Sequence, residues 1–345
     1  MSNQQKQQTV YRLPKQVGYR SIQTHTEPIP EPTKHEVLIK IKALSLNYRD
    51  FAIANGTYPF PVKPDVVPLS DCAGEIIDAG SAVDTVRKGD KVVVSFDPTN
   101  QYGPQKNWHH GHGGPIDGFL REYAVVPATA VVKIPEESKL GWPQLASLVC
   151  TGVTTWNALF GPVSVKPGQV VLVQGTGGVS MTALILCKAF GCSVIVTSSS
   201  DDKLQFVQEK YGADHVINYR TTPAWGKEAL KLTNGEGVDA IIENGGAGTI
   251  EQSLEALKMG GLIAIIGFLA KPDVMPDVAL GALSKGAIVR GITVGAKQYL
   301  EELVTFVCAR GLEIPVDKVF RFDQVQEAYA HLESGSHVGK VCIEL

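Results

Sequence analysis

A glycine-rich turn between an apolar strand and a helix is the feature that most constrains how this chain can fold. The strand VVLVQ comes first, then the turn GTGGVS from Gly175 to Ser180, which runs into the helical stretch VSMTALILCKAF. Glycine adopts positive φ at little cost and lets another group approach the backbone closely. The start of a helix offers N–H groups and positive potential to phosphate. We therefore predict a pyrophosphate site whose contacts are Thr176, Gly177, Gly178 and Val179.

The strands after this turn predict the architecture around it. They read SVIVTSS, HVINY, VDAIIENG, LIAIIGF and AIVRGITVG, with helical stretches between most of them. Strands that are apolar on both faces are covered on both sides, and their alternation with helices indicates a parallel sheet. We predict an α/β fold with a six-stranded, doubly wound dinucleotide-binding sheet. Ser180 stands where the G-x-G-x-x-G pattern has its last glycine, so a purely structural turn is the alternative.

The end of the second strand bears on the choice of cofactor. In NAD sites an acidic residue here binds the ribose 2′-hydroxyl. This chain has Ser198 and Ser199 at that place, followed by Lys203. Hydroxyls and a cation suit a 2′-phosphate, which a carboxylate repels, so we favour NADP(H) over NAD(H). We assign the acidic pair at 201–202 to the cap of the next helix. Tyr219, after the third strand, is either a further phosphate contact or a packing residue.

The segments on either side predict a second, β-rich domain. Between residues 36 and 135 the chain has short strands such as VLIKIKALSL and DKVVVSF, with little helical period. The loop Asp97–Gly118 reads as a surface loop, and its His109, His110 and His112 are either an adventitious metal cluster or, as we expect, solvated side chains. The terminal strand in HVGKVCIEL is expected to return to this domain. We place the β-rich domain at 1–150 and 298–345, around a nucleotide domain at 151–297.

Composition excludes several classes of protein. The net charge is −3, with no basic stripe that would indicate nucleic-acid binding. No apolar run reaches the roughly 18 residues of a membrane span. The polar start, MSNQQKQQTV, is not a secretory signal and is expected to be a frayed end, so we predict a cytoplasmic protein. The six scattered cysteines contain no C-x-x-C pair, and we expect buried, reduced thiols.

Several motifs in order give the chain a family resemblance. ALSLNYRDFAIANGTYP, VPLSDCAGEIIDAG, CTGVTTWNAL, VKPGQVVLVQGTGGVS and GKVCIEL together resemble the medium-chain dehydrogenase/reductase superfamily. These motifs are most similar to those of its zinc-free, quinone-oxidoreductase-like branch. The resemblance implies a Rossmann domain beside a GroES-like catalytic domain, and a homodimer joined at the edge strand AIVRGITVG. It also implies that Thr155, Asn244, Gly267 and Phe268 line the cofactor site.

The resemblance also bears on zinc. A catalytic zinc in this superfamily needs two cysteines, or a cysteine and a similar ligand, together with a histidine. Here Asn47 stands at the first position, Ser70-Asp71 at the histidine position and Cys150 at the last. Amide and hydroxyl groups bind Zn²⁺ poorly, and the loop that would hold a structural zinc has no cysteine. We therefore predict no metal at either place.

Without a metal, hydride addition to an electron-poor π system is the favoured chemistry. Hydrogen-bond donors can meet the charge that develops on oxygen. The candidates are Asn47, Tyr48 and Asp50. The Asn47 amide can donate either to a substrate oxygen or to the nicotinamide ribose of the cofactor, and Asp50 can instead form a structural pair with Arg49. We predict an NADPH-dependent reductase of quinones or activated alkenes acting on a small molecule. The alternatives are a zinc-free alcohol or ketone dehydrogenase, and a cofactor-binding protein with little turnover. Possible walls of an apolar substrate pocket are Tyr58, Phe60, Trp108 and Trp156.

Overall fold

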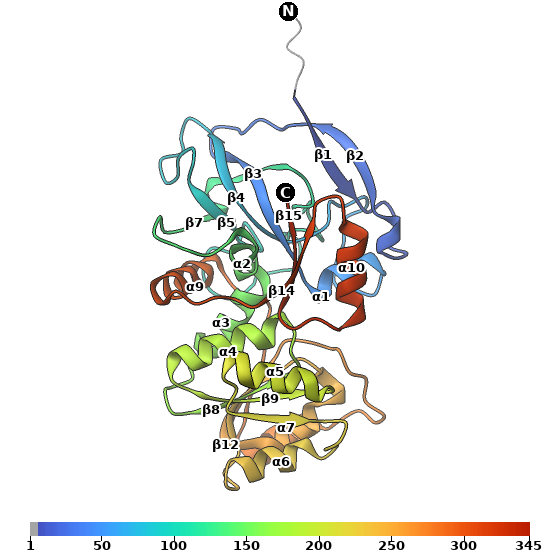
Figure 1. Ribbon diagram of the computed structural model, residues 1–345, viewed down its shortest axis with the longest axis vertical. Helices are drawn as coiled ribbons and strands as arrows, with labels where there is room; N and C mark the ends of the chain where they lie inside the picture. Colours follow the sequence, from blue (N-terminus) through green and yellow to red (C-terminus); the bar gives the residue numbers. More distant parts are fainter. Residues whose placement is uncertain (1–5) are drawn as a thin grey trace, which may run out of the picture. The chain divides into compact units, whose positions relative to one another are not determined.

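The computed structural model describes residues 6–345 and separates them into two compact units (Figure 1). The split unit consists of the residues up to Val153 together with Val294–Leu345. The central unit is Thr154–Thr293. The chain thus leaves the first unit, builds the second without interruption, and returns to complete the first.

A parallel six-stranded sheet forms the centre of the central unit. Its strand order is β10-β9-β8-β11-β12-β13, and every neighbouring pair is parallel. This order, with the first strand in the middle, is that of a doubly wound dinucleotide-binding sheet, so the predicted fold class is confirmed. The strands are β8 (Val170–Gln174), β9 (Ser193–Ser198), β10 (His215–Asn218), β11 (Val238–Glu243), β12 (Leu257–Ile265) and β13 (Ile288–Gly291).

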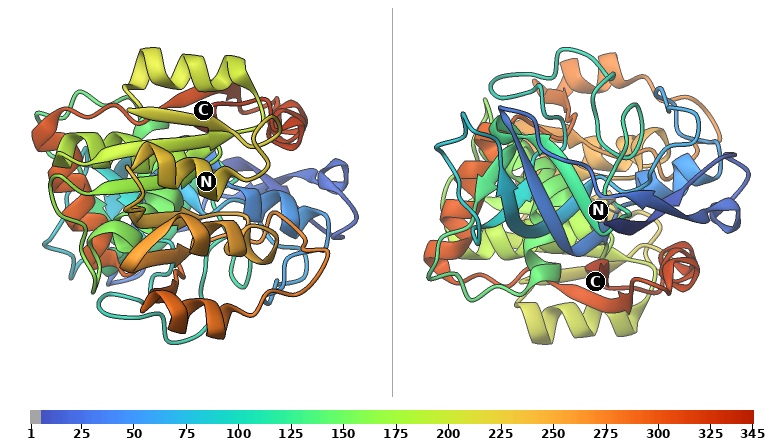
Figure 2. Two further views of the ribbon diagram at one scale, coloured as in Figure 1. Left: turned by 90° about the horizontal axis from the view of Figure 1, so that it is seen from below. Right: turned by 90° about the horizontal axis from the view of Figure 1, so that it is seen from above.

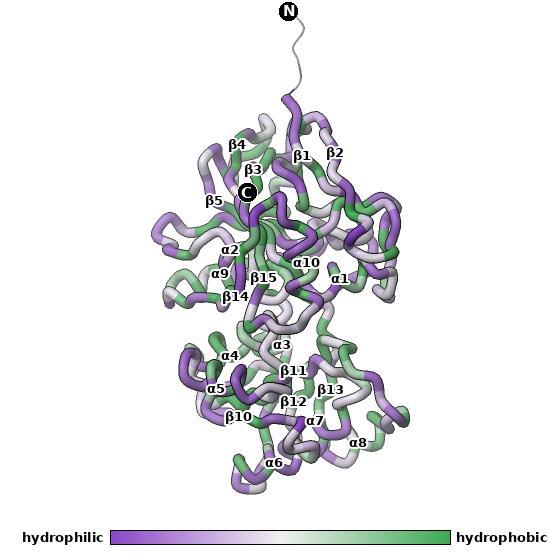
Figure 3. Tube along the Cα trace, turned by 45° about the vertical axis from the view of Figure 1, so that its right-hand side comes forward, coloured by the Kyte–Doolittle hydropathy of each residue, from purple (hydrophilic) through white to green (hydrophobic). Residues whose placement is uncertain are grey.

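Helices cover both faces of this sheet, which explains why its strands are apolar throughout. In Figure 1, α4 and α5 lie on one side of the strands and α6 and α7 on the other. Figure 3 shows the hydrophobic colour of the strands between them. Leu172, Ile195 and Ile263 belong to the buried core. The helices of the unit are α3 (Val153–Phe160, beginning at the unit boundary), α4 (Gly178–Phe190), α5 (Asp201–Tyr211), α6 (Trp225–Leu232), α7 (Ile250–Ala256) and α8 (Val278–Lys285).

A mostly antiparallel sheet forms the core of the split unit. Its order is β14-β15-β3-β4-β5-β7, with β6 also paired to β3. The last strand, β15, lies antiparallel to β3, so the predicted return of the chain terminus to this unit is confirmed. Figure 2 (right) shows β3 and β4 side by side. The strands are β3 (Glu36–Leu46), β4 (Asp71–Ala79), β5 (Lys91–Val94), β6 (Tyr123–Pro127), β7 (Val131–Lys133), β14 (Val316–Arg321) and β15 (Lys340–Glu344).

Short helices pack around this sheet, including one that the sequence pattern did not reveal. They are α1 (Tyr48–Ala54), α2 (Trp142–Ala146), α9 (Lys297–Arg310) and α10 (Val325–Ser334). Helix α1 has only two turns, too few for a clear 3.6-residue period. It begins where the Asp50 carboxylate accepts a hydrogen bond from the backbone N–H of Asn47 at 2.8 Å. Among the described residues no helix is both long and apolar enough to cross a membrane.

The beginning of the chain is more ordered than expected. Residues 1–5 lie outside the described residues, but Gln7–Arg12 forms β1, antiparallel to β2 (Gln23–Pro28). Val10 of β1 and the following Leu13 are buried in the core of the split unit. The expectation of a frayed end was therefore wrong from Gln7 onward, because two apolar side chains among the polar ones anchor the strand.

The loop from Asp97 to Gly118 is also less exposed than expected. His109 is exposed, but His112 is only 4% exposed and its ring packs against Phe119. The Nδ1–H of His112 donates to the carbonyl of Asp117 at 2.9 Å, while its Nε2 is buried with no hydrogen-bond partner among the described residues. Burial lowers the pKa of His112 to about 4. The histidines thus do not share one solvated surface, and His112 is part of the core.

This buried histidine should make stability depend on pH. Folding lowers the pKa of His112 from 6.5 to about 4, so the folded state favours the neutral imidazole. The contribution of His112 to the free energy of unfolding is therefore complete above pH 6.5 and is lost as the pH falls from 6.5 to about 4. The whole difference corresponds to about 3 kcal/mol. We expect His112→Asn, which keeps a donor for the Asp117 carbonyl, to gain stability relative to wild type between about pH 7 and about pH 4.5. Urea unfolding at several pH values measures this.

The pH dependence of wild type must be compared with that of the variant, because buried Asp50 changes the free energy of unfolding in the opposite direction over part of the same pH range. Burial raises the pKa of Asp50 to about 6, which makes stability fall as the pH rises from about 4 to about 6. The control is His25→Asn, since His25 lies exposed on β2. Parallel pH curves for wild type and His112→Asn would contradict the prediction.

Candidate functional site

The glycine-rich turn of the central unit faces open space. Gly175 directly follows β8 and has φ of 80°, a conformation that favours glycine. A Cβ atom built on Gly175 or Gly177 would meet no atom within 4 Å. Gly177 precedes α4, and among residues 6–345 no side chain caps that helix with a hydrogen bond. The turn therefore has the room and the uncapped helix start that a dinucleotide pyrophosphate needs.

Ser180 fits the place of the missing third glycine because its hydroxyl is used within the turn. Its Oγ donates to the carbonyl of Gln174 at 2.6 Å. The side-chain amide of Asn244 donates to the same carbonyl at 2.9 Å and to Ser180 Oγ at 3.0 Å. The predicted cofactor residue Asn244 thus lies beside the turn, and its amide is hydrogen-bonded to residues at both ends of the turn.

A buried carboxylate holds this support together, and sequence reasoning missed it. Glu243, the last residue of β11, is fully buried. It accepts hydrogen bonds from Gln174 Nε2 at 2.7 Å, from the N–H groups of Gly245 and Gly246 at 2.9 Å each, and from the hydroxyls of Thr249 and Ser253. An acid at the end of an otherwise apolar strand was the available signal. The contacts fix the ends of β8 and β11 against each other.

The end of β9 carries the predicted 2′-phosphate residues. Ser198 is the last residue of β9 and is buried, while Ser199 and Lys203 are partly exposed. Ser200 caps α5, because its Oγ accepts from the backbone N–H of Lys203 at 3.4 Å. The assignment of the cap to the acidic pair at 201–202 was therefore wrong. Both acids lie in the first turn, where the helix dipole favours them.

The other predicted cofactor residues of the central unit lie at neighbouring strand ends. Tyr219 follows β10, and its N–H donates to the carbonyl of Ser198 at 3.1 Å. Gly267 follows β12 closely, and a Cβ there would lie 2.2 Å from the carbonyl oxygen of Asn244. Phe268 beside it is half exposed. Thr155 is buried, and its hydroxyl donates to the carbonyl of Val179 in the first turn of α4 at 3.3 Å.

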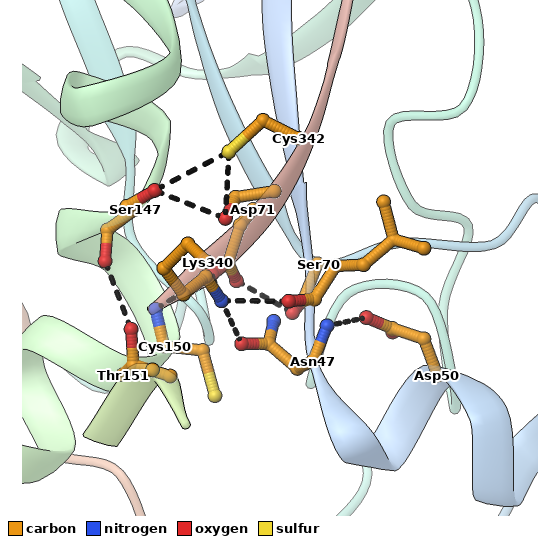
Figure 4. A network of polar contacts seen from close by, with 12 residues as sticks. Asn47, Asp50, Ser70, Asp71, Ser147, Cys150, Thr151, Lys340 and Cys342 are labelled. Carbon is orange, nitrogen blue, oxygen red and sulfur yellow. Dashed lines mark hydrogen bonds and ion pairs between the residues drawn. The ribbon is translucent and has the colours of Figure 1, made fainter. Parts of the chain in front are cut away.

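In the split unit, a buried lysine organises the polar cluster drawn in Figure 4. Lys340, on β15, is 2% exposed. Its ammonium donates to the carbonyl of Leu46 at 2.7 Å and to Asn47 Oδ1 at 2.5 Å, and lies 4.0 Å from Asp71 Oδ2. Asn47 Nδ2 is buried and makes no hydrogen bond to the described residues. Sequence reasoning missed Lys340 because it stands in a strand that reads as apolar core.

The acceptor atoms of this cluster are already engaged. Asp71 Oδ1 accepts from Ser70 Oγ at 2.7 Å, and Oδ2 accepts from the backbone N–H of Cys150 at 3.1 Å. Burial raises the pKa of Asp71, although Lys340 and the nearby amide of Asn47 lower it in part. Burial, with the charge of Asp71, raises the pKa of Cys150 to about 12, so its thiol stays protonated near neutral pH. Among the described residues, the buried polar side-chain atom of this cluster without a hydrogen bond is the donor Asn47 Nδ2.

The three predicted catalytic residues differ in their surroundings. Asn47 belongs to the cluster just described. Asp50 is buried and lies 3.4 Å from Nη1 of Arg49, which also donates to the carbonyl of His112 at 3.0 Å. The structural pair between Arg49 and Asp50 therefore forms. Tyr48, at the start of α1, is 47% exposed and leaves its ring accessible.

Three of the predicted aromatic walls lie together. Phe60 stacks on Trp108 with ring centroids 3.8 Å apart, and Tyr58 meets Phe60 edge to face. They line one hollow of the split unit together with Arg49. Trp156 is not part of this group, since it belongs to α3 of the central unit and packs against Phe160.

The donor set does not suit a catalytic zinc. Asn47 directs its amide oxygen to Lys340, and Cys150 is the one thiol among the positions expected to hold the metal. Thiolate and imidazole are the ligands that Zn²⁺ prefers. Residues 6–345 contain no group of three or more His, Cys, Asp or Glu side chains arranged to hold a metal ion. The cluster instead contains the ammonium group of Lys340, which binds Asn47 Oδ1 and faces Asp71.

Two family models match the chain, one in each part of the fold. The alcohol dehydrogenase GroES-like domain matches residues 33–136, and the zinc-binding dehydrogenase domain matches residues 178–309. The first match lies in the split unit, and the second covers most of the central unit and α9.

Similar proteins span nearly the whole chain. A zinc-type alcohol dehydrogenase-like protein of Schizosaccharomyces pombe is 43% identical over 95% of this chain and 96% of its own. An acryloyl-coenzyme A reductase of Metallosphaera sedula is 30% identical over 91% of this chain and 93% of its own. A solved structure from Sinorhizobium meliloti covers 99% of both chains with a TM-score of 0.90 and 36% identity. The chain therefore belongs to the medium-chain dehydrogenase/reductase superfamily, whose members are oxidoreductases that bind nicotinamide cofactors.

Proposed function

We propose that the protein uses NADPH to reduce an activated alkene or a quinone, and that it does so without zinc. The observation that carries the proposal is the polarity of the buried cluster in the split unit. Within residues 6–345 Asn47 Nδ2 makes no hydrogen bond, whereas Asn47 Oδ1 accepts one from Lys340 and each oxygen of Asp71 accepts one. This arrangement favours a ligand that accepts a hydrogen bond from Asn47 Nδ2.

An accepting oxygen is what the carbonyl of an enone or quinone presents. NADPH, which the turn after β8 and the end of β9 would hold, would supply the hydride that the β-carbon of an enone takes up. The alkene electron pair then shifts, so that negative charge develops on the carbonyl oxygen. Asn47 Nδ2–H can stabilise that charge, with the ammonium of Lys340 behind the amide. A proton from solvent at the α-carbon would complete the saturated product, with the cofactor left in its oxidised form.

Alcohol oxidation is the less suitable reaction for this cluster. A base would have to take the hydroxyl proton as hydride leaves the alcohol carbon. Asp71 accepts hydrogen bonds at both oxygens, and the Asp50 carboxylate is buried against Arg49 and the N–H of Asn47. The relative named for acryloyl-coenzyme A reduction supports a conjugated substrate. The relative named as zinc-type alcohol dehydrogenase-like favours the second candidate, a zinc-free alcohol or ketone dehydrogenase.

The proposal for NADPH rests on the end of β9. Ser198, Ser199 and Lys203 provide hydroxyls and a cation after the strand, and no carboxylate stands at the two serine positions. The turn after β8 and the start of α4 would hold the pyrophosphate. The acids of the first turn of α5 follow the cap, and Asp201 accepts a hydrogen bond from Asn218 at 2.8 Å.

The first prediction is an activity profile. We expect NADPH consumption with 2-cyclohexenone and with a quinone, little with butanal, and no loss after treatment with a zinc chelator. Asn47→Asp should fold, because the new carboxylate still accepts from Lys340, but it presents no donor to the substrate. We expect kcat to fall by about 100-fold, the scale of losing one oxyanion donor. Nicotinamide absorbance measures every arm.

The matched control is Asn55→Asp, which makes the same change at the other end of α1. It should keep wild-type rates. Turnover of butanal alone, or activity that a chelator abolishes and zinc restores, would reject the proposed function. Tight NADPH binding without turnover of any acceptor would favour a cofactor-binding protein.

A second prediction concerns the choice of cofactor. Ser199→Asp with Lys203→Ala should weaken NADPH binding by about 10- to 100-fold, the scale of a hydrogen bond to a charged group, and leave NADH unchanged or improved. Titration of each cofactor by fluorescence measures both affinities. Lys210→Ala, in the last turn of the same helix, removes the same charge without touching the strand end. An equal loss for NADPH and NADH would contradict the 2′-phosphate assignment.

We propose that the protein is a homodimer joined through the edge of the parallel sheet. β13 is bonded to β12 on one side and ends the sheet. Beside it, α8 has no buried residue, and Leu280 and Leu283 are exposed together with Val274 and Met275 in the preceding loop. An unpaired strand next to exposed apolar side chains favours pairing with a second copy.

A charge on this surface should separate the subunits. We expect Leu280→Asp with Leu283→Asp to shift the mass measured by light scattering from dimer to monomer, because the carboxylates would be buried unpaired in the interface. Val17→Asp, at an exposed apolar position of the split unit, is the control and should leave the mass unchanged. A wild-type mass of one chain, or a dimer unaffected by the double substitution, would refute this interface.

A further inference from the structure

The ammonium group of Lys340 is buried in the polar cluster and faces Asp71. The reaction proposed above does not yet assign a specific role to Lys340. Two of its three N–H bonds have fixed acceptors, the Leu46 carbonyl and Asn47 Oδ1. Its counter-ion Asp71 lies 4.0 Å away, beyond hydrogen-bond length. Burying an ammonium is costly unless it is paired and hydrogen-bonded. The fold maintains this arrangement at the first residue of its last strand.

The contact determines which end of the Asn47 amide is available. A side-chain amide can present either its oxygen or its NH₂ group to a ligand. Lys340 is a donor only, so it must meet the oxygen, and Nδ2 is then left for another partner. That nitrogen is buried and has no hydrogen bond within residues 6–345. An unmet buried donor costs free energy, which a ligand oxygen would recover.

We propose that Lys340 is the positioning residue of the reduction. It holds the Asn47 amide with Nδ2–H toward the acceptor oxygen, and its positive charge strengthens that donor as charge develops on the oxygen. Asp71 keeps the ammonium in place and balances its charge. This inference rests on the proposed function, since it requires Asn47 to be the donor.

Lys340 could instead have a purely structural role, in which it only joins β15 to the end of β3 and the start of α1. A double-mutant cycle with Asn47 distinguishes the structural role from the positioning role. If Lys340 acts through Asn47, removing it should matter little once the amide is gone. If it only stabilises the fold, its loss should add independently to that of Asn47. A positioning role should also slow the weaker acceptor more, because an enone depends more on stabilisation of its oxygen than a quinone does.

The experiment uses the full-length Asn47→Ala, Lys340→Met and double variants, with Lys318→Met, an exposed lysine on β14, as control. We expect Lys340→Met to lower kcat for 2-cyclohexenone by about 10-fold or more, to affect a quinone less, and to leave NADPH affinity unchanged. The double variant should be no slower than Asn47→Ala within about 3-fold. Lys318→Met should keep wild-type rates.

The possible outcomes separate this inference from the proposed function. Multiplying losses in the double variant, or full activity of Lys340→Met beside an inactive Asn47→Ala, would overturn the positioning role and leave the proposed reaction standing. Full activity of Asn47→Ala would remove the donor on which both depend. If Lys340→Met does not fold, Lys340→Arg, which keeps the charge and a donor, should remain faster than Asn47→Ala. A folded Lys340→Arg as slow as Asn47→Ala would overturn the inference.

Discussion

The ammonium of Lys340 joins three parts of the split unit that are far apart in sequence. Through Leu46 and Asn47 it contacts the end of β3 and the start of α1, and it faces Asp71 at the start of β4. Cys150 is attached to the same carboxylate through its backbone N–H. Because a buried charge tolerates few geometries, the positions of Asn47 and Cys150 follow from the place of the last strand in the sheet. The candidate site therefore forms only when the chain has returned from the central unit.

A buried charge of the opposite sign has the same role in the central unit. Glu243 collects donors from the end of β8, from its own following loop and from α7. It thereby fixes Gln174, whose carbonyl in turn accepts from Ser180 and Asn244. The glycine turn directly follows Gln174, and a Cβ on Gly175 or Gly177 would meet no described atom within 4 Å. In both units a buried ion that makes several hydrogen bonds sets the geometry of less constrained neighbours.

The sequence predicted what depends on repeated patterns and missed what depends on single contacts. The parallel sheet followed from six apolar strands alternating with helices, and the glycine turn from its position after the first of them. By contrast, α1 has two turns, Val10 and Leu13 are two apolar residues in a polar stretch, and the burial of His112 depends on packing against Phe119. Lys340 and Glu243 were missed because a charge at the end of an apolar strand reads as exposed unless its partners are known.

The two buried ions also explain why the units suit different anionic groups. Glu243 takes up the donors around it, so the groups left at the glycine turn are those of the uncapped start of α4, which suits a phosphate. Lys340 takes up acceptors, so the group left over is the Asn47 donor, which suits an oxygen that gains charge during the reaction. In the function proposed above, the helix dipole would meet the permanent anion of the cofactor, and the Asn47 amide backed by Lys340 would meet the transient one. That division agrees with the proposed hydride transfer to a neutral carbonyl compound.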